Sequence, residues 1–407
     1  MNASIRLAVP LVAALALSAC NAGGYSNMPS TTGSAGTAAA PSHVIPEWQA
    51  KHLAHAACPA VAEKAHCLAL IDDVKAGPID HGMQPQVQQA VSGWWPSDFQ
   101  TRYNLPSGSN GSGQIVAIVD AYDNPNVASD LAAYRSNFGL GTASFTKYNQ
   151  NGQQSGYPSG DTGWGLEIDL DVQMVSAVCP KCTIYLIEAN GADQGDLQTA
   201  EATAVSLGAH IVSNSWGCFG NNNCVSSSYF NTPGVMYLAS SGDSGYGTQG
   251  PAALATVVSV GGTILSKSGS TYSEIAWRSA GSGCATGITK PSWQHDSGCS
   301  YRTMNDVSAV AQAVAMYDTY GHGGWIQASG TSVSSPMIGG VYGLAGNASA
   351  QNAGQNLWKL KKKKYKKELH DITAGSNGSC GGSYLCTAVK GYDGPTGWGT
   401  PNGVKAF

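Results

Sequence analysis

Apolar runs of strand length alternate with stretches of helical spacing from about Ser109 to beyond residue 260. The first run, Gly113–Asp120, is almost uninterrupted, which is typical of a strand buried on both faces. Asn126–Phe138 then carries its apolar side chains at helical spacing. Further strands are expected at 183–187, 210–213, 235–239 and 256–260, with a helix at 196–207. This alternation predicts an α/β fold, a mainly parallel β-sheet flanked by helices on both faces, with chemistry at the carboxyl ends of strands.

The N-terminus has the pattern of an export signal. Arg6 precedes an apolar stretch, Leu7–Ala19, that is too short to anchor the chain across a bilayer. The stretch ends in Leu-Ser-Ala-Cys20 and resembles the lipobox of bacterial lipoproteins, which implies cleavage before Cys20 and lipidation of that residue. An ordinary signal peptide with a chance cysteine is the alternative. Both interpretations predict an exported protein, either a lipoprotein of an outer or cell-surface membrane or a secreted one.

Composition divides the rest of the chain into three segments. Residues 20–42 are rich in Gly, Ser, Thr, Ala and Pro and read as a flexible tether. Residues 43–95 form a short pro-like segment, and the main domain is expected at 96–407, entered through Trp94-Trp95-Pro96. The formal net charge of -4 gives no reason to expect a nucleic-acid partner. Seven lysines between Lys359 and Lys367 are interpreted as a solvated helix face or loop, with membrane or nucleic-acid contact as the minor alternative.

Cysteine usage agrees with export. Apart from Cys20, ten cysteines fall into sequence-adjacent pairs, and an even count in an exported chain favours disulfides. Neighbour pairing is the simplest connectivity, although sequence alone leaves others open. The sequence Cys179-Pro-Lys-Cys182 also fits a redox motif or half of a zinc site, but no second such motif accompanies it. The expected pairs are Cys58/Cys67, Cys179/Cys182, Cys218/Cys224, Cys284/Cys299 and Cys380/Cys386.

The sharpest chemical signal is the sequence Ser-Gly-Thr-Ser332-Val-Ser-Ser-Pro, which begins at Ser329 and is followed by small apolar residues. Small residues before Ser332 permit close approach of backbone and substrate. The segment after it reads as a helix, and a helix N-terminus favours developing negative charge. The motif resembles the nucleophile motif shared by subtilisins and sedolisins, which makes Ser332 the candidate nucleophile.

The histidine base that would accompany such a serine is missing. No histidine occurs from Gly82 to Ala209, and His210 directly precedes an apolar strand without the His-Gly-Thr context of subtilisins. The corresponding stretch carries Glu167 and Asp171, which lie four residues apart on one face of an expected helix. Two adjacent carboxylates share a proton, and the raised pKa makes a base that works at acidic pH. An acidic surface turn is the alternative, and Asp169 lies on a different face.

A third signal is the sequence Ser-Ser-Gly242-Asp243-Ser-Gly, which follows an expected strand. Asp243 lies where subtilisins have an asparagine that donates to the oxyanion. An aspartate donates only when it is protonated, which ties this role to low pH. The alternative is a turn-forming aspartate in a glycine-rich loop.

Together, Glu-x-x-x-Asp, Ser-Gly-Asp-Ser-Gly and Ser-Gly-Thr-Ser, in this order, resemble the sedolisin family of serine-carboxyl peptidases over residues 95–407. The resemblance implies a subtilisin-like fold and an endopeptidase that forms an acyl-enzyme on protein or peptide substrates. It also implies Glu167 as general base and acid, Asp171 as its partner, Asp243 as oxyanion donor and Ser332 as nucleophile. The substrate cleft is expected between Ser215, Trp216 and Gly217 on one side and Gly242 on the other, where backbone could pair with an extended peptide.

The C-terminal loops suit an oxygen-ligated cation. Two carboxylates and the carbonyls of glycine-rich loops are ligands that calcium prefers. The resemblance implies one structural Ca²⁺ held by Asp371 and Asp393 and by the carbonyls of Ile372, Val389 and Gly391.

Family members have a large propeptide, whereas only about 75 residues separate Cys20 from the core here. The segment is therefore expected to be a reduced inhibitory or chaperone region, with self-processing near residues 85–100 as a hypothesis. The chain is expected to be a monomer that meets a membrane only through its lipid anchor. The alternatives are a catalytically silent surface lipoprotein that uses the fold as a binding module, and esterase chemistry on the same serine.

Overall fold

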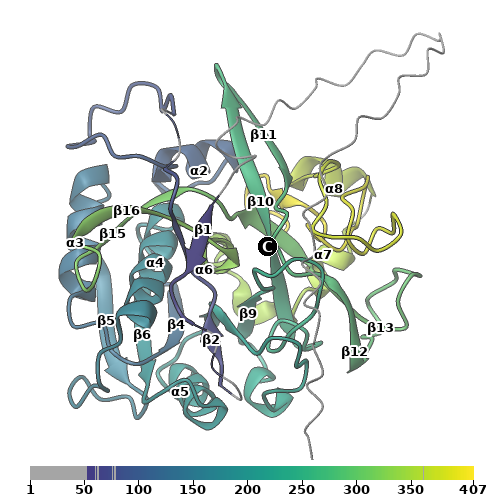
Figure 1. The fold of residues 1–407 in the computed structure, drawn as a ribbon, viewed down its shortest axis with the longest axis horizontal. Coiled ribbons are helices and arrows are strands. Elements are labelled where there is room, and N and C mark those ends of the chain that lie inside the picture. Colours follow the sequence, from purple (N-terminus) through teal and green to yellow (C-terminus); the bar gives the residue numbers. More distant parts are fainter. Residues whose placement is uncertain (1–52, 60, 62–63, 76, 78, 361) are drawn as a thin grey trace, which may run out of the picture. The chain divides into compact units, whose positions relative to one another are not determined.

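A mainly parallel eight-stranded sheet forms the centre of the fold in the computed structural model (Figure 1). Its order is β11-β10-β9-β7-β4-β6-β5, and β14 also pairs with β10. All these pairings are parallel except that of β10 with β11. The predicted α/β architecture is confirmed. The strands are β4 (Ile115–Ala121), β5 (Ser144–Asn149), β6 (Thr183–Ala189), β7 (Ile211–Asn214), β9 (Met236–Ser240), β10 (Val257–Ser268), β11 (Thr271–Ala276) and β14 (Val307–Val310).

Helices cover both faces of this sheet because successive side chains of a strand point to opposite sides. In β4, Val116 and Ile118 join a core that also contains residues of α3, α4 and α6. Ala117 and Val119 join a second core on the side of α5. The helices are α2 (Pro96–Arg102), α3 (Val127–Phe138), α4 (Thr162–Val178), α5 (Gln194–Ser206), α6 (Thr331–Ala345), α7 (Gln355–Trp358) and α8 (Lys362–Glu368), with 3-10 turns η1 (Ser227–Phe230) and η2 (Ala348–Ala350).

The structure describes residues 53–407 except 60, 62, 63, 76, 78 and 361, and not the side chains of 362 and 363. All described residues belong to one compact unit, 44–407. The expected signal peptide (1–19), the lipidation site Cys20 and the tether (20–42) lie outside the described residues and stay predictions.

The described part of the expected pro-like segment is built into two further sheets. One is four-stranded and antiparallel, in the order β1-β3-β16-β15, and in the other β2 pairs antiparallel with β8. Two smaller pairs are β12 with β13 and β17 with β18. These strands are β1 (Ala54–Ala56), β2 (His66–Cys67), β3 (Leu70–Asp72), β8 (Trp216–Gly217), β12 (Gly283–Thr289), β13 (Tyr301–Met304), β15 (Val314–Asp318), β16 (Gly324–Ser329), β17 (Leu369–His370) and β18 (Thr400–Pro401).

The predicted pairing of neighbouring cysteines is confirmed for all five disulfides. They are Cys58–Cys67, Cys179–Cys182, Cys218–Cys224, Cys284–Cys299 and Cys380–Cys386.

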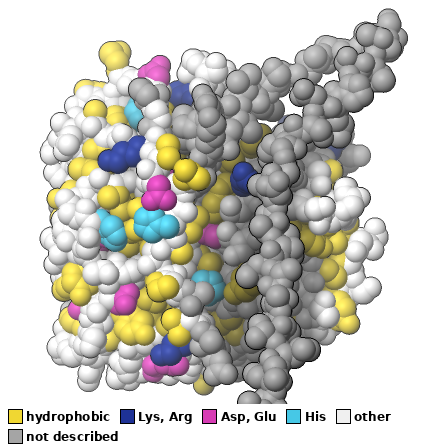
Figure 2. Space-filling view, viewed as in Figure 1, with side chains coloured by type: hydrophobic (Ala, Val, Ile, Leu, Met, Phe, Trp, Pro, Cys, Tyr) yellow, Lys and Arg dark blue, Asp and Glu magenta, His cyan; other side chains and the backbone are white. Residues whose placement is uncertain are grey.

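Charged residues make up only 11% of the chain. On the face shown in Figure 2 they lie singly or in small groups among apolar and uncharged polar side chains. Within the lysine-rich segment, Tyr365 is buried while Lys364, Lys366 and Lys367 are exposed, the pattern of a solvated helix face. None of the described helices has both the length and the apolar character needed to cross a membrane.

Candidate active site

Ser332 is the second residue of α6, and this helix begins directly after Gly330, which follows the end of β16. Its side chain is buried, and its Oγ donates a hydrogen bond to Glu167 Oε2 at 2.9 Å. The backbone N–H groups of the first helical turn lack partners within the helix and favour negative charge nearby. The fold thus brings the predicted nucleophile into hydrogen-bond contact with the predicted base.

Gly330 allows the groups around Ser332 to approach the backbone closely. Its φ of 131° lies in a region that favours glycine. A Cβ at this position would lie 2.3 Å from the carbonyl oxygen of Leu68 and 2.7 Å from Asp243 Oδ2. Both oxygens therefore face the same bare Cα, two residues before the nucleophile.

Glu167 and Asp171 lie one turn apart on α4, as predicted, and both are fully buried. The helix is fixed at its start by Asp161, whose side chain accepts hydrogen bonds from the backbone N–H groups of Gly163 and Trp164. Ser215 Oγ donates to Asp171 Oδ1 at 2.7 Å, which holds the second carboxyl group in place.

Burial raises the pKa of Glu167 and of Asp171 well above the usual range of carboxylic acids. A hydrogen bond between the two carboxyl groups raises the pKa of Asp171 further. Glu167 Oε1 and Asp171 Oδ2 receive no hydrogen bond from any other donor among the described residues. One proton held between these two oxygens would satisfy both, so the pair is arranged to share a proton.

Asp120 is a third buried carboxyl group of this cluster, and the sequence reasoning did not single it out. It lies near the carboxyl end of β4, and neither of its oxygens has a described hydrogen-bond partner. Burial raises the pKa of Asp120 to about 8, and its charge raises the pKa of both Glu167 and Asp171. Its place at the end of the first apolar run was the available signal, since parallel sheets carry their chemistry at that edge.

Asp243 follows β9 and reaches the start of α6. Its Oδ1 accepts hydrogen bonds from Thr331 N at 2.8 Å and from Thr331 Oγ1 at 2.7 Å. Its Oδ2 is shielded from solvent and has no described partner. Burial raises the pKa of Asp243 to about 7, against the lowering effect of the hydrogen bonds from Thr331.

The residues expected to form the cleft flank these groups. The Ser215 carbonyl oxygen lies 3.4 Å from Ser332 Oγ, and the N–H of Gly242 donates to Thr331 Oγ1 at 3.2 Å. Trp216 and Gly217 form β8, whose backbone pairs with β2. The Trp216 side chain is buried in the core, where its Nε1 donates to the carbonyl of Val119 at 3.0 Å. Its contribution to a cleft therefore comes from its backbone.

The chain's own N-terminal segment also enters this site, which no sequence motif indicated. The backbone N–H groups of Leu68 and Ala69 donate to Glu167 Oε2 at 2.8 Å and 2.7 Å. The same oxygen accepts the hydrogen bond from Ser332. Contacts between residues this far apart in sequence leave no local signal.

Four of the five expected calcium ligands are connected in pairs by hydrogen bonds. Asp371 accepts hydrogen bonds from the N–H of Gly391, and Asp393 Oδ2 accepts one from the N–H of Val389. Among the described residues, no N–H donates to the carbonyls of Ile372, Val389 or Gly391. Burial and the charge of Asp371 together raise the pKa of Asp393 to about 8, against the lowering effect of hydrogen bonds from Val389 and Thr396. Paired carboxylates and free carbonyl oxygens on one set of loops fit a hard divalent cation such as Ca²⁺.

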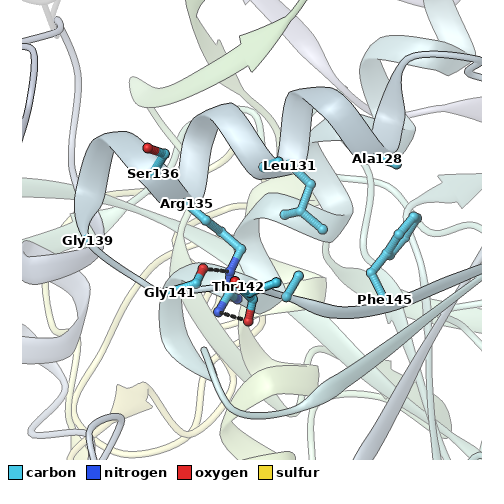
Figure 3. Close-up of a pocket in the computed structure, with 10 residues that line it drawn as sticks. Ala128, Leu131, Arg135, Ser136, Gly139, Gly141, Thr142 and Phe145 are labelled. Carbon is cyan, nitrogen blue, oxygen red and sulfur yellow. Dashed lines mark hydrogen bonds between the residues drawn. The ribbon is translucent and has the colours of Figure 1, made fainter.

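Asp169 lies apart from the catalytic candidates, as its helical face predicted. It faces Asn124, Asp130 and Asp318, and the three carboxylates bring oxygens within 4.8 Å of one another. A hollow of about 670 Å³ beside α3 contains none of the catalytic candidates (Figure 3). Within it Arg135 donates to the carbonyls of Gly141 and Thr142, so this guanidinium is already engaged.

Comparison with known proteins places this fold in a class. The model of the subtilase family matches residues 111–377, and the chain therefore belongs to the subtilase family. Its relatives include kumamolisin of Bacillus sp. (strain MN-32), 27% identical over 78% of this chain and 63% of the relative. Sedolisin of Pseudomonas sp. (strain 101) is 27% identical over 75% of this chain and 59% of the relative. Human tripeptidyl-peptidase 1 is 26% identical over 78% of this chain and 65% of the relative.

A solved structure agrees with these relatives. Pseudomonas sedolisin, a serine-carboxyl proteinase complexed with pseudo-iodotyrostatin, matches with a TM-score of 0.66 and 25% identity over 77% of this chain and 96% of that one. The chain spans less than two thirds of the length of the curated relatives it matches. The resemblance to sedolisins is thus supported by homologues and by fold, and the homologues are serine peptidases.

Proposed function

We propose that this protein is a serine-carboxyl endopeptidase in which Ser332 is the nucleophile and Glu167, backed by Asp171, is the general base and acid. The hydrogen bond from Ser332 Oγ to Glu167 Oε2 is the observation that supports this most directly. It supplies the nucleophile–base contact that acyl transfer needs, with a carboxylate as the acceptor. Among the described residues, no histidine side chain is hydrogen-bonded to Ser332 Oγ.

In the proposed reaction, Ser332 Oγ attacks the carbonyl carbon of a peptide bond while its proton passes to Glu167. The carboxyl pair spreads that proton between Glu167 and Asp171, which keeps Glu167 basic enough to accept it at acidic pH. The C–N bond then breaks, and Glu167 returns the proton to the departing amine. Water releases the acyl group from Ser332 by the reverse sequence of proton transfers.

Asp243 is proposed to stabilise the oxyanion. Because its Oδ1 already accepts an N–H and an O–H from Thr331, a proton on Asp243 would sit on Oδ2, the oxygen that lies beside Gly330. A protonated Oδ2 can donate to negative charge on the substrate oxygen. A pKa of about 7 keeps most of Asp243 protonated below neutrality, so activity is expected to favour acidic pH.

The test is hydrolysis of an acid-denatured protein between about pH 3 and pH 8. Wild type is expected to cleave at acidic pH, and Ser332→Ala and Glu167→Gln are expected to be inactive while remaining folded. Equal rates for all three would contradict the proposal. Inactivity of wild type at every pH, with retained affinity for unfolded polypeptide, would favour the alternative of a binding module.

The proposal extends to location and metal. An exported monomer anchored through lipid on Cys20 agrees with the sequence of the first twenty residues. The mass of the mature N-terminus tests this, since Cys20→Ala should lose the acyl mass and the membrane association. One Ca²⁺ held by Asp371, Ile372, Val389, Gly391 and Asp393 would tie the C-terminal loops together as a structural ion.

A further inference from the structure

Positive charge is concentrated in one short segment of the chain. Seven of the 21 basic residues lie between Lys359 and Lys367, whereas the formal net charge of the whole chain is -4. The segment itself contains no acid, and Glu368 directly follows it. Acids therefore outnumber bases in the rest of the chain, so an anionic partner would be attracted to this segment and repelled elsewhere.

The structure holds the second half of this segment on the domain as helix α8. Tyr365 is 5% exposed, and its ring meets the ring of Trp398 edge-on, with 5.4 Å between the centroids. At the end of the helix, the backbone N–H of Asn402 donates to the carbonyl of Glu368 at 3.0 Å. The Asn402 side-chain amide donates to the carbonyl of Lys367 at 3.1 Å. These contacts fix the position of α8 without using any described lysine side chain.

Four exposed lysines on and beside α8 form a basic patch, the lysine surface. They are Lys359, Lys364, Lys366 and Lys367. Among the described residues, none of these four forms an ion pair, since the lysines that do are Lys64, Lys147, Lys267 and Lys290. Single exposed lysines are common, but a cluster of four or more without acidic partners beside an amphipathic helix is typical of surfaces that bind anionic lipid headgroups.

An anionic membrane fits the lysine surface better than a nucleic acid does. Sites for single-stranded nucleic acids combine basic side chains with exposed aromatic rings on which bases stack. Tyr365, the aromatic residue of this segment, is buried instead. A membrane requires only long cationic side chains that reach a layer of phosphates. About 30 residues separate Cys20 from Leu53, the first described residue, so lipid on Cys20 would keep the domain close to a membrane.

We propose that the lysine surface docks the domain on the phosphates of anionic lipid headgroups, as a second contact beside the lipid anchor expected at Cys20. Lipid chains and basic surfaces act together in membrane binding, because stable anchoring takes two such signals. Figure 1 shows α8 well apart from α4, which carries Glu167, so docking and catalysis use different parts of the molecule. The inference does not depend on the proposed peptidase function. It extends the sequence-based expectation, in which the lipid anchor is the only contact with a membrane.

Docking is tested by sedimentation with vesicles, in a chain that can neither be acylated nor digest itself. The mature chain carrying Cys20→Ala and Ser332→Ala should bind vesicles that contain phosphatidylglycerol and should not bind vesicles of phosphatidylcholine alone. Because exposed charges are screened over about 8–10 Å at physiological ionic strength, this binding should weaken as salt is added. Equal binding to both kinds of vesicle, or binding to neither, would overturn the proposal.

Neutralising the lysine surface should remove most of this binding. Each lysine near an anionic surface contributes about fivefold in affinity, so Lys364→Gln/Lys366→Gln/Lys367→Gln in this chain should bind about 10²-fold more weakly. Lys364→Arg/Lys366→Arg/Lys367→Arg keeps the three charges and should bind as the parent chain does. Equal affinities of the Gln and Arg variants would overturn the proposal.

A matched control separates the lysine surface from net charge. Lys64→Gln/Lys75→Gln/Lys181→Gln removes the same formal charge from three other positions and should change the affinity by less than about twofold, because distant charges are screened. A loss as large as that of the lysine-surface Gln variant would mean that overall charge attracts the protein, and would overturn the proposal. Duplex DNA that bound the parent chain as tightly as the anionic vesicles do, at the same ionic strength, would overturn the assignment to a membrane.

Activity separates this inference from the proposed function. With Ser332 restored, the lysine-surface Gln variant should hydrolyse a soluble peptide at the wild-type rate while it binds anionic vesicles weakly. Hydrolysis by every chain, with vesicle binding unaffected by the lysine substitutions, would overturn docking alone. Vesicle binding that depends on the lysine surface, with no hydrolysis by any chain, would support docking and overturn only the peptidase function.

Discussion

The two faces of α4 carry buried acids that differ in what surrounds them. On one face, Glu167 and Asp171 meet Asp120 and the hydroxyl of Ser332. On the other face, Asp169 is as deeply buried and meets a cluster of its own. Burial raises the pKa of all three acids on the helix well above the usual range. Depth and raised pKa therefore do not distinguish the catalytic candidates from the other acid.

The difference lies in the neighbours. Asp130 accepts hydrogen bonds from the N–H and hydroxyl of Thr319, and Asp318 accepts them from the N–H of Tyr320 and the ring of His322. These donors hold Asp130 and Asp318 in place, whereas Asp169 Oδ1 has no described donor and no nucleophile bound to its carboxyl group. On the catalytic face, Glu167 accepts the hydrogen bond from Ser332 on one oxygen, while its other oxygen has no described donor and can take up and release a proton. A buried acid becomes a functional candidate when its unsatisfied oxygen faces a group that can react.

The largest expected effect comes from replacing one acid on each face of α4 with its amide. Glu167→Gln keeps the shape of the side chain and removes the base, so kcat/KM should fall by about 10²–10⁴-fold. The matched variant Asp169→Asn should change kcat/KM by less than about threefold, since it leaves Ser332 untouched. Steady-state hydrolysis at acidic pH measures both, with circular dichroism as the control for folding. Similar losses of kcat/KM in the two variants would show that the two faces of α4 do not differ in function.

The next effect concerns the oxyanion donor. Asp243→Ala should lower kcat by about 10²-fold, the usual cost of one such donor. Asp243→Asn retains a donor that needs no proton, so the variant should keep part of the activity and lack the decline expected of wild type as pH rises through about 7. Rate profiles from pH 3 to 8 test this. If the rate of Asp243→Asn declined at the same pH, the decline would be caused by the Glu167/Asp171 pair instead.

The buried acids together should make the fold more stable at low pH. The pKa values of Asp243, at about 7, and of Asp120, at about 8, lie above the ordinary value near 4. Between about pH 4 and pH 8 the folded chain therefore binds more protons than the unfolded chain, and stability falls as pH rises through that window. The Tm of Ser332→Ala, which cannot digest itself, should be higher at pH 5 than at pH 8. A Tm that rises with pH would contradict these protonation states.

The smallest effect sharpens the contrast between acids that hold protons and acids that suit a cation. Ca²⁺ needs ionised ligands, so added Ca²⁺ should raise the Tm of Ser332→Ala more at pH 8 than at pH 5. Introducing Asp393→Asn should remove this gain, whereas introducing Asp169→Asn should leave it. Thermal unfolding with Ca²⁺ and with a chelator measures the difference. An equal gain in both variants would place the ion elsewhere.

Local patterns predicted much of this molecule. The strand and helix alternation gave the parallel sheet, and the spacing of Glu167 and Asp171 put them on one face of α4. Sequence-adjacent cysteines pair because short loops close easily. The roles of the site residues stay predictions until they are tested.

What the sequence did not show depends on contacts between distant segments. Asp120 looks like the polar end of a strand, and only the packing of α4 on β4 brings it to the carboxyl pair. Leu68 and Ala69 lie in a stretch without a recognisable motif. Their partners come from α4 and from the segment before β8, so the local sequence does not reveal them. The sequence also did not show that the Trp216 indole lies in the core. The direction of this side chain depends on the sheet beneath it, and therefore again on contacts between distant segments.

The pairing of β3 with β16 fixes the register of the paired strand relative to Ser332. Leu70 lies opposite Ser329, and Ser329 is three residues from Ser332 along the chain. A strand that slipped by one residue would move by about 3.3 Å and turn each side chain to the opposite face. A polypeptide that paired with the same edge would have its register fixed by this backbone. The register, together with the fit of side chains, would then determine which peptide bond lies at Ser332.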